Sequence, residues 1–219
     1  VFLTAGLGGG TGTGAAPLFA KIAKEEGALT IGIVTKPFMF EGKKRERNAM
    51  QGLSELQKYT DSLIIVSNNN LLEVIGRKPI EEAFQAADNV LRQGVQTISD
   101  LIAVPALVNL DFADVRSVMQ NQGAALIGIG MADGEDKAIN AAEKAIQSPL
   151  LEAQITGAKS AIINITGGDK VSLYDAQSAV AVIQDAAGGE IDTIFGIAIN
   201  EQLGDSCLLY TSDAADDLT

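Results

Sequence analysis

The chain has 219 residues, of which 47% are hydrophobic and 20% are charged, and its formal net charge is −12. This apolar fraction excludes a disordered chain, and the length suffices for one large domain or two modest ones. The acidic balance disfavours a general nucleic-acid binder, and no apolar run approaches the roughly 18 residues that cross a bilayer. With no histidine and only Cys207, zinc centres, haem centres and histidine-dependent nucleophilic catalysis are excluded as well.

The two ends of the sequence look truncated. The chain opens without methionine on an apolar run, Val1–Ala5, which is typical of a buried strand already under way, and we expect no secretory signal. It ends on residues 207–219, which resemble the conceptual translation of a sequencing-library adapter and for which we predict neither helix nor strand. We therefore favour a non-native tail over a genuine acidic one. The lone cysteine allows no internal disulfide, which fits a reducing cytosol.

Short apolar runs alternate with amphipathic stretches, the βαβ pattern typical of a parallel sheet covered by helices. In the first half we predict strands at 1–5, 29–35 and 63–67 and helices at 15–26 and 44–58. A long helix is predicted at 80–102, because its apolar residues recur at spacings of three and four. A second α/β unit follows, with helices at 113–122, 137–147 and 173–187 and strands at 124–131, 161–166 and 191–200.

The strongest functional signal is the glycine-rich segment Gly6–Gly14, between a predicted strand and a predicted helix. Glycines let backbone N–H groups approach an oxyanion with no Cβ in the way, and the positive end of the helix dipole favours a phosphate there. Thr11 and Thr13 add hydroxyl donors. The pattern therefore favours a phosphate-binding loop over a mobile glycine turn.

Two common phosphate-binding motifs fit this segment poorly. A Walker A loop requires Lys and then Ser or Thr after its last glycine, but Ala15 and Ala16 follow Gly14. A dinucleotide fingerprint placed on Gly10–Ala15 requires an acid at the end of the next strand, where Lys36 stands. A dinucleotide-binding oxidoreductase is therefore the least favoured function.

The segment Gly8–Gly14, GGGTGTG, matches the signature loop of the tubulin superfamily letter for letter. Further segments resemble its FtsZ family in the same order: TKPF at 35–38, FEGKKR at 40–45, NLDFADV at 109–115, SPLL at 148–151 and NITGG at 164–168. The resemblance extends from Val1 to about Asp205. It implies an α/β, tubulin/FtsZ-like fold: a partial Rossmann-like GTP-binding domain at 1–79, whose N-terminal strands are missing, a long central helix at 80–102, a second, GTPase-activating α/β domain with a mixed sheet at 103–206, and the tail at 207–219.

The same resemblance implies a GTP-binding and GTP-hydrolysing protein that polymerises head to tail with itself for bacterial cell division. It would act in the cytoplasm, at the mid-cell division ring, and would reach the membrane through tethering division proteins rather than by insertion. GTP or GDP would carry Mg²⁺, with no metal ligands of the protein's own and no nucleic-acid partner. A non-catalytic fragment that caps filaments is the alternative. Because the family's first phosphate loop is missing, we expect this chain alone to bind GTP weakly and hydrolyse little.

The resemblance also assigns the nucleotide contacts. Gly10, Thr11 and Gly12 would hold the phosphates, while Gly8, Gly9, Thr13 and Gly14 would shape the loop. Glu41 and Arg45 would contact the ribose and phosphate side of GTP, although the residues alone favour a helix-start acid and a solvated basic face.

On the long helix, the resemblance places Phe84 beside the guanine base, and Asp88, one helical turn later, at the edge of that base. The residues alone leave open whether Phe84 is a ligand contact or a core side chain. A carboxylate at Asp88 could accept from both N1–H and the 2-amino group of guanine. Asn89 is the fallback if the register is shifted by one.

Asn109, Asp111 and Asp114 follow the long helix. By spacing alone, the two acids predict a helix N-cap with an acid at the third helical position. The FtsZ resemblance instead implies that this segment inserts into the nucleotide site of the next subunit, where its carboxylates position and polarise the attacking water. Such a division of the site would make hydrolysis conditional on assembly.

Overall fold

The computed structural model describes residues 1–76, 79–103, 111–148, 150–151, 155–168, 171–189, 191–200 and 203–214. Its contacts divide the chain into two units. The first contains Val1–Gln96 and Met119–Ala125, and the second contains Thr97–Val118 and Leu126–Thr219. One boundary therefore falls inside the long helix α4 (Ile80–Ala103), and another falls inside β4 (Gly123–Ala132).

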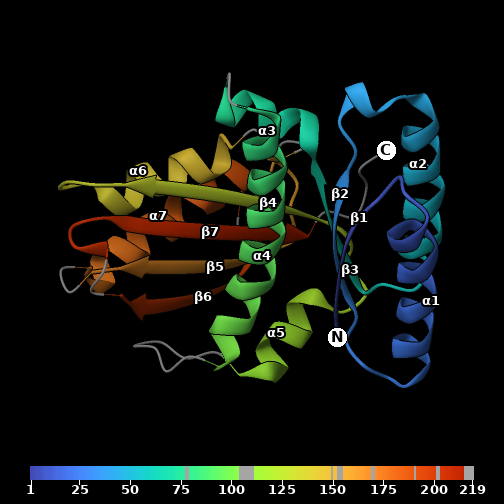
Figure 1. Ribbon diagram of the computed structural model, residues 1–219. Coiled ribbons are helices and arrows are strands. Elements are labelled where there is room, and N and C mark those ends of the chain that lie inside the picture. Colours follow the sequence, from blue (N-terminus) through green and yellow to red (C-terminus); the bar gives the residue numbers. More distant parts are fainter. Residues whose placement is uncertain are drawn as a thin grey trace. The chain divides into compact units, whose positions relative to one another are not determined.

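The first unit is built on a parallel sheet. Strands β1 (Phe2–Gly6), β2 (Ile31–Lys36) and β3 (Ser62–Ser67) lie in this order, and the first residues of β4 pair in parallel with β3. Helices α1 (Thr11–Glu25) and α2 (Lys43–Gln57) cover one face of this sheet (Figure 1), and their buried apolar residues form one cluster with β2 and β3. The short η1 (Met39–Glu41), α3 (Asn68–Ile75) and the first part of α4 complete the unit.

The strand registers of the first unit bring three loops to one edge. Gly6 lies opposite Thr35, and Lys36 lies opposite Ser67. The carboxyl ends of β1, β2 and β3 therefore meet at the same edge of the sheet, which is where open α/β sheets bind their ligands.

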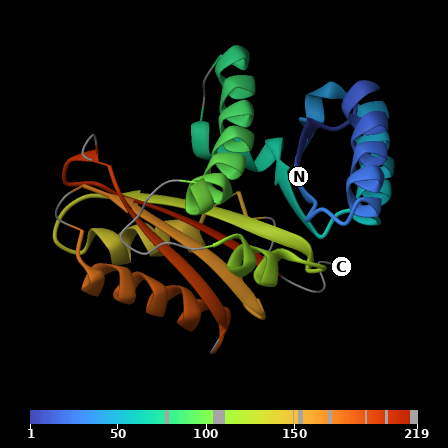
Figure 2. The same cartoon turned by 90° about the horizontal axis from the view of Figure 1, so that it is seen from below.

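The second unit contains a mixed sheet, as the resemblance implied. Its strands follow the order β4-β7-β5-β6, in which β5 (Ser160–Gly167) is parallel to β6 (Asp192–Ile199) and antiparallel to β7 (Cys207–Ala214). Helices α6 (Lys137–Ile146) and α7 (Leu173–Ala187) lie side by side on one face of the sheet (Figure 2). Helix α5 (Phe112–Met119) precedes β4. None of the helices, within the described ranges, is both long and apolar enough to span a bilayer.

Most of the predicted elements are confirmed, with ends displaced by a few residues. The helix predicted at 173–187 coincides with α7, because Ser172 caps it by accepting a hydrogen bond from the Asp175 N–H. Helix α3 was missed, because its three leading asparagines are typical of loops rather than helices. Helix α1 begins at Thr11, four residues earlier than predicted, because the glycines of its first turn hide a helix start.

The prediction that residues 207–219 contain no strand is wrong, since Cys207–Ala214 form β7 and pair along the full length of β5. The strand has the period-2 alternation that the sequence analysis overlooked: Cys207, Leu209 and Thr211 are buried, whereas Leu208 between them is only partly so. Whether these residues are foreign to the natural protein is a separate question, on which our expectation stays a prediction.

The thiol of Cys207 provides a test of β7. Burial raises the pKa of this thiol from 9.0 to about 11, and the side chain has no exposed surface. We expect a thiol reagent at pH 8 to label the native chain at least ~100-fold more slowly than the urea-unfolded chain. Equal rates would contradict the placement of β7 in the sheet.

The same pKa shift links stability to pH. Because only the unfolded thiol ionises between the two pKa values, the contribution of the buried Cys207 thiol to the unfolding free energy is present below pH 9.0 and is lost as the pH rises towards about 11.

Candidate nucleotide-binding site

The glycine-rich segment lies at the carboxyl end of β1, as predicted. Residues Leu7–Gly10 connect β1 to α1, and Thr11–Gly14 form the first turn of the helix. The N–H groups of such a first turn have no partner within the helix, and the helix dipole adds positive potential there. The loop and the helix start therefore offer a run of backbone donors to an anion.

The glycines of this segment are required for different structural reasons. A Cβ on Gly12 would lie 2.7 Å from the Gly6 carbonyl oxygen and 3.1 Å from the Ala5 Cβ, so glycine is required there for α1 to approach β1. A Cβ on Gly9 or Gly10 would meet nothing within 4 Å, and neither residue has a positive φ. Packing within the chain thus explains Gly12, whereas the bare backbone of Gly9 and Gly10 leaves room for a ligand.

The first part of the loop is fixed by side chains. The Gly8 N–H donates to Thr13 Oγ1 at 2.8 Å, and Asn48 Nδ2 of α2 donates to the Gly8 carbonyl at 3.3 Å. Gly8 itself has φ +106°, a conformation that favours glycine. Gly9, Gly10 and Thr13 border an open depression of about 360 Å³, whose other wall includes Asn48 and Gln51. The backbone donors are therefore held in place before any ligand arrives.

Glu41 and Arg45 are in direct contact beside this loop. Arg45 Nη1 donates to Glu41 Oε2 at 2.7 Å, and the Phe38 N–H donates to Glu41 Oε1 at 2.9 Å. The Glu41 side chain is only 12% exposed, whereas that of Arg45 is 55% exposed. A Cβ on Gly8 would lie 3.0 Å from the Arg45 carbonyl oxygen, so the start of α2 abuts the glycine loop. Glu41 therefore fixes the guanidinium of a residue whose backbone abuts the loop, through a charge-assisted hydrogen bond.

Phe84 belongs to a cluster of three aromatic rings. Its ring packs edge-on against Phe38 at 5.2 Å and Phe40 at 6.3 Å between centroids, while Phe38 and Phe40 stack at 5.0 Å. Phe38 is 1% exposed, but Phe84 is 42% exposed and Phe40 58%. Phe84 therefore anchors α4 to the loop after β2 and still presents ring surface to a ligand. Asp88, one helical turn later, is exposed.

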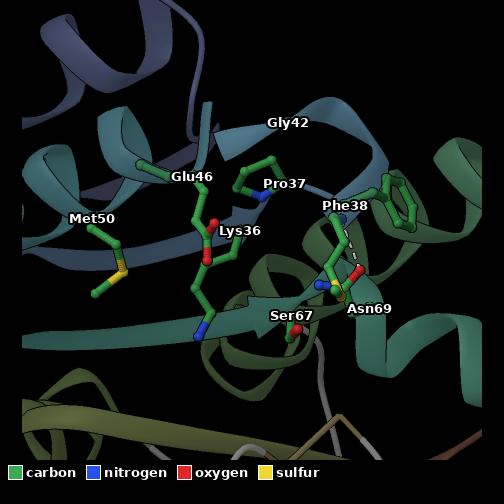
Figure 3. Close-up of a pocket in the computed structure, with 10 residues that line it drawn as sticks. Lys36, Pro37, Phe38, Gly42, Glu46, Met50, Ser67 and Asn69 are labelled. Carbon is green, nitrogen blue, oxygen red and sulfur yellow. Dashed lines mark hydrogen bonds between the residues drawn. The ribbon is translucent and has the colours of Figure 1, made fainter. Parts of the chain in front are cut away.

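A second, smaller cavity lies at the carboxyl ends of β2 and β3. It has a volume of about 160 Å³, and Figure 3 shows Lys36, Glu46 and Met50 around it. The Met39 N–H donates to Asn69 Oδ1 at 3.0 Å, which ties η1 to α3 across this cavity. The contact fixes the loop that carries Glu41.

Asn68 is a site candidate that the sequence analysis missed. It directly follows β3, is 5% exposed, and its Oδ1 accepts no hydrogen bond from any residue that the structure describes. A buried acceptor without a partner is costly, so it indicates a ligand or water at this edge. Its position immediately after a buried parallel strand is the signal that could have identified it.

Asp111 and Asp114 lie in the second unit and make the N-cap that their spacing predicts. The Asp114 N–H donates to Asp111 Oδ1 at 2.9 Å, and the Asp111 N–H donates to Asp114 Oδ2 at 3.1 Å. Both side chains are exposed at the start of α5, so the cap leaves carboxylate oxygens open to solvent. Asn109 lies outside the described residues.

Contacts within the first unit join four of the predicted site residues: Gly8 abuts Arg45, Arg45 pairs with Glu41, and Glu41 binds the backbone of Phe38, whose ring contacts Phe84. These residues come from three separate segments of the sequence. The glycine loop, the Glu41–Arg45 pair and Phe84 are therefore joined by one continuous series of contacts, and their roles in holding phosphate, ribose and base stay predictions.

Comparison with known proteins identifies two matching family models. The GTPase domain of the tubulin/FtsZ family matches residues 1–76, and the C-terminal domain of the FtsZ family matches residues 123–211. Together they match most of the chain.

Solved structures agree with this assignment. A mutant of FtsZ from M. jannaschii is 42% identical, with a TM-score of 0.94 over 98% of this chain and 65% of its own length. An empty FtsZ dimer from M. jannaschii is also 42% identical, with a TM-score of 0.92 over 98% of this chain and 63% of that one. A CetZ2 protofilament from Haloferax volcanii with GTPγS bound shares the fold at 19% identity, with a TM-score of 0.79 over 100% of this chain and 65% of that one. The chain thus spans just under two thirds of these relatives, and it belongs to the FtsZ family.

Proposed function

We propose that this chain supplies the GTP site, at the carboxyl edge of its first sheet, of a GTPase that assembles head to tail with copies of itself into filaments for cell division, and that this chain alone binds GTP weakly and hydrolyses little. The observation that carries this proposal is the bare backbone of Gly9 and Gly10 before the first turn of α1, for which packing within the chain gives no reason. The relatives support it, because one is a dimer of FtsZ and another is a protofilament with GTPγS bound.

In this proposal, different groups of the first unit bind the phosphates and the base of the nucleotide. The amides of Gly9, Gly10 and Thr11 bind the phosphates, and Arg45, held by Glu41, adds positive charge beside them. The exposed ring surface of Phe84 lies beside the base, and Asp88 accepts hydrogen bonds from its edge.

The second unit supplies the groups that promote hydrolysis on a neighbouring subunit. Asp111 and Asp114, with Asn109, orient the water that attacks the γ-phosphate, so that turnover requires two copies in contact. Phosphoryl transfer depends mainly on positioning and charge neutralisation. Exposed carboxylates can position the water without covalent chemistry, while Mg²⁺ and Arg45 would neutralise phosphate charge.

Mg²⁺ enters this proposal with the nucleotide. Among the described residues no three His, Cys, Asp or Glu side chains are grouped as a metal cage. The proposal requires no such cage, because Mg²⁺ keeps several waters and is usually bound through phosphates with one or two carboxylates. The bound ion would neutralise phosphate charge. We also propose, from the same resemblance, that the filaments form a ring at mid-cell in the cytoplasm and that other division proteins tether them to the membrane.

The proposal is tested by titrating the protein with fluorescent GTP, ATP and NADH analogues and by measuring phosphate release over a range of protein concentrations. We expect saturable binding of GTP in preference to ATP and NADH. Phosphate release per molecule should rise with protein concentration as filaments form. Preferential binding of NADH, or equal release per molecule at every concentration, would contradict the proposal.

The variant Gly10→Ser separates binding from folding. A serine side chain would occupy the open space above the loop, so we expect GTP affinity to fall at least ~tenfold. The backbone of Gly10 (φ −83°) suits serine, and serine is a favourable N-cap, so the unfolding free energy should stay within about 0.5 kcal/mol. Affinity is measured by titration and stability by urea unfolding; unchanged affinity would remove Gly10 from the phosphate site.

A further inference from the structure

A side chain of α2 fixes one peptide group of the glycine loop. Asn48 Nδ2 donates to the Gly8 carbonyl at 3.3 Å, and on the other side the Gly8 N–H donates to Thr13 Oγ1 at 2.8 Å. Gly8 is buried between the Arg45 backbone and the Pro37 ring, which a Cβ on Gly8 would approach to 3.0 Å and 3.3 Å. Both polar groups of Gly8 are therefore bound within the protein.

The consequence for the loop follows from peptide geometry. The peptide between Gly8 and Gly9 is trans, so its C=O and its N–H point in opposite directions. When the Gly8 carbonyl is directed to Asn48, the Gly9 N–H is directed away from α2, and therefore away from the depression whose other wall includes Asn48 and Gln51. No described residue accepts a hydrogen bond from this N–H, and a Cβ on Gly9 would meet nothing within 4 Å.

We infer that Asn48 is a positioning residue of the phosphate site, which holds the Gly9 N–H in the orientation that a nucleotide phosphate requires. This inference rests on the proposed function. Asn48 does not touch the nucleotide in this role: it acts through the Gly8 carbonyl, and its effect is confined to ligands that carry a phosphate. Prearranged donors bind an anion without the cost of reorganising the loop.

The chain provides a matched pair of variants. Asn48→Asp keeps the shape of the side chain but removes its N–H donors and places a carboxylate against the Gly8 carbonyl. Gln51→Glu makes the same amide-to-carboxylate change on the same helix and in the same depression. The two variants therefore share their change of charge, and only the first loses the contact with the loop.

We expect Asn48→Asp to weaken the binding of GTP and GDP by about tenfold more than Gln51→Glu does, the size of a lost hydrogen bond. Both variants should bind guanosine as the unmodified chain does, because guanosine has no phosphate. Equal affinities of the two variants for GTP, or an equal loss of guanosine binding, would overturn the inference.

A second readout needs no nucleotide. In the ¹⁵N-labelled chain, Asn48→Asp should shift the amide resonance of Gly9, because its peptide reorients, while Gln51→Glu should leave this resonance in place. An unmoved Gly9 resonance in Asn48→Asp would overturn the inference even if the unmodified chain binds GTP well. Failure of the unmodified chain to bind GTP would instead refute the proposed function, and the Gly9 resonance would still decide the orientation.

Discussion

In a chain extended to the length of its FtsZ relatives, replacing Asp111 by asparagine is expected to lower GTP turnover at least ~100-fold while leaving GTP affinity within about twofold. The structure makes asparagine the informative substitution. Asp111 Oδ1 caps α5 by accepting from the Asp114 N–H, and an asparagine oxygen caps equally well. Alanine would remove both the cap and the charge. Losing one side chain that orients the attacking water and accepts its proton typically costs about 10²- to 10⁴-fold in rate. Phosphate release and nucleotide titration on the same sample measure the two quantities.

A capping acid elsewhere in the second unit provides the control. Asp175 accepts from the Ser172 N–H as the third residue of the capping box of α7, the position that Asp114 has on α5. Asp175→Asn should change the unfolding free energy by no more than about 1 kcal/mol and leave turnover intact. If Asp175→Asn lowered turnover as much as Asp111→Asn, the effect would belong to helix stability and the catalytic role of Asp111 would be refuted.

The origin of the catalytic acid can be tested by mixing variants. Gly10→Ser binds GTP poorly but carries an intact Asp111, while Asp111→Asn binds GTP but lacks the acid. If the acid acts on the nucleotide of a neighbouring subunit, an equal mixture should recover turnover that neither variant has alone. A mixture no more active than the mean of its components would indicate that each subunit acts on its own nucleotide.

The sequence predicted most of the fold because its periodicity is strong and local. The buried runs of β2 and β3 and the amphipathic pattern of α4 needed no tertiary information. Helix α3 and strand β7 were missed for opposite reasons. In α3 the leading asparagines have weak helix propensity, which packing overrides. In β7 the sequence does contain an alternation of buried side chains, but the resemblance to an adapter was given more weight.

In the candidate site, too, some residues could be predicted from a local segment of the sequence and others could not. The glycine loop carries its chemistry in one segment, so GGGTGTG was enough to predict it. Asn48 could not be recognised, because its importance comes from a contact across the fold: it binds a carbonyl 40 residues earlier in the chain. Asn68 follows a buried strand, which is a signal in the sequence, but only the fold shows that its buried oxygen has no partner among the described residues. The aromatic contacts of Phe84 likewise join residues far apart in the sequence.

Two glycines of α1, Gly12 and Gly14, differ in how much room the fold leaves for a side chain, and this difference can be tested by mutation. The resemblance assigned Gly12 to phosphate binding, and this assignment stays a prediction, but packing gives Gly12 a role of its own. In Gly12→Ala the new Cβ would lie 2.7 Å from the Gly6 carbonyl oxygen, a backbone atom that can move only if α1 moves away from β1. We expect the unfolding free energy to fall by about 1–3 kcal/mol, as in other overpacked sites.

Gly14→Ala is the matched variant, two residues later in the same helix. Its Cβ would meet nothing within 4 Å, and alanine is favoured over glycine in a helix by about 0.8–1.0 kcal/mol, so the chain should gain stability. Urea unfolding of the two variants should therefore give changes of opposite sign. A Gly12→Ala chain as stable as the unmodified one would show that α1 and β1 are not in close contact. In that case the glycine at position 12 would have to be explained by the nucleotide rather than by packing.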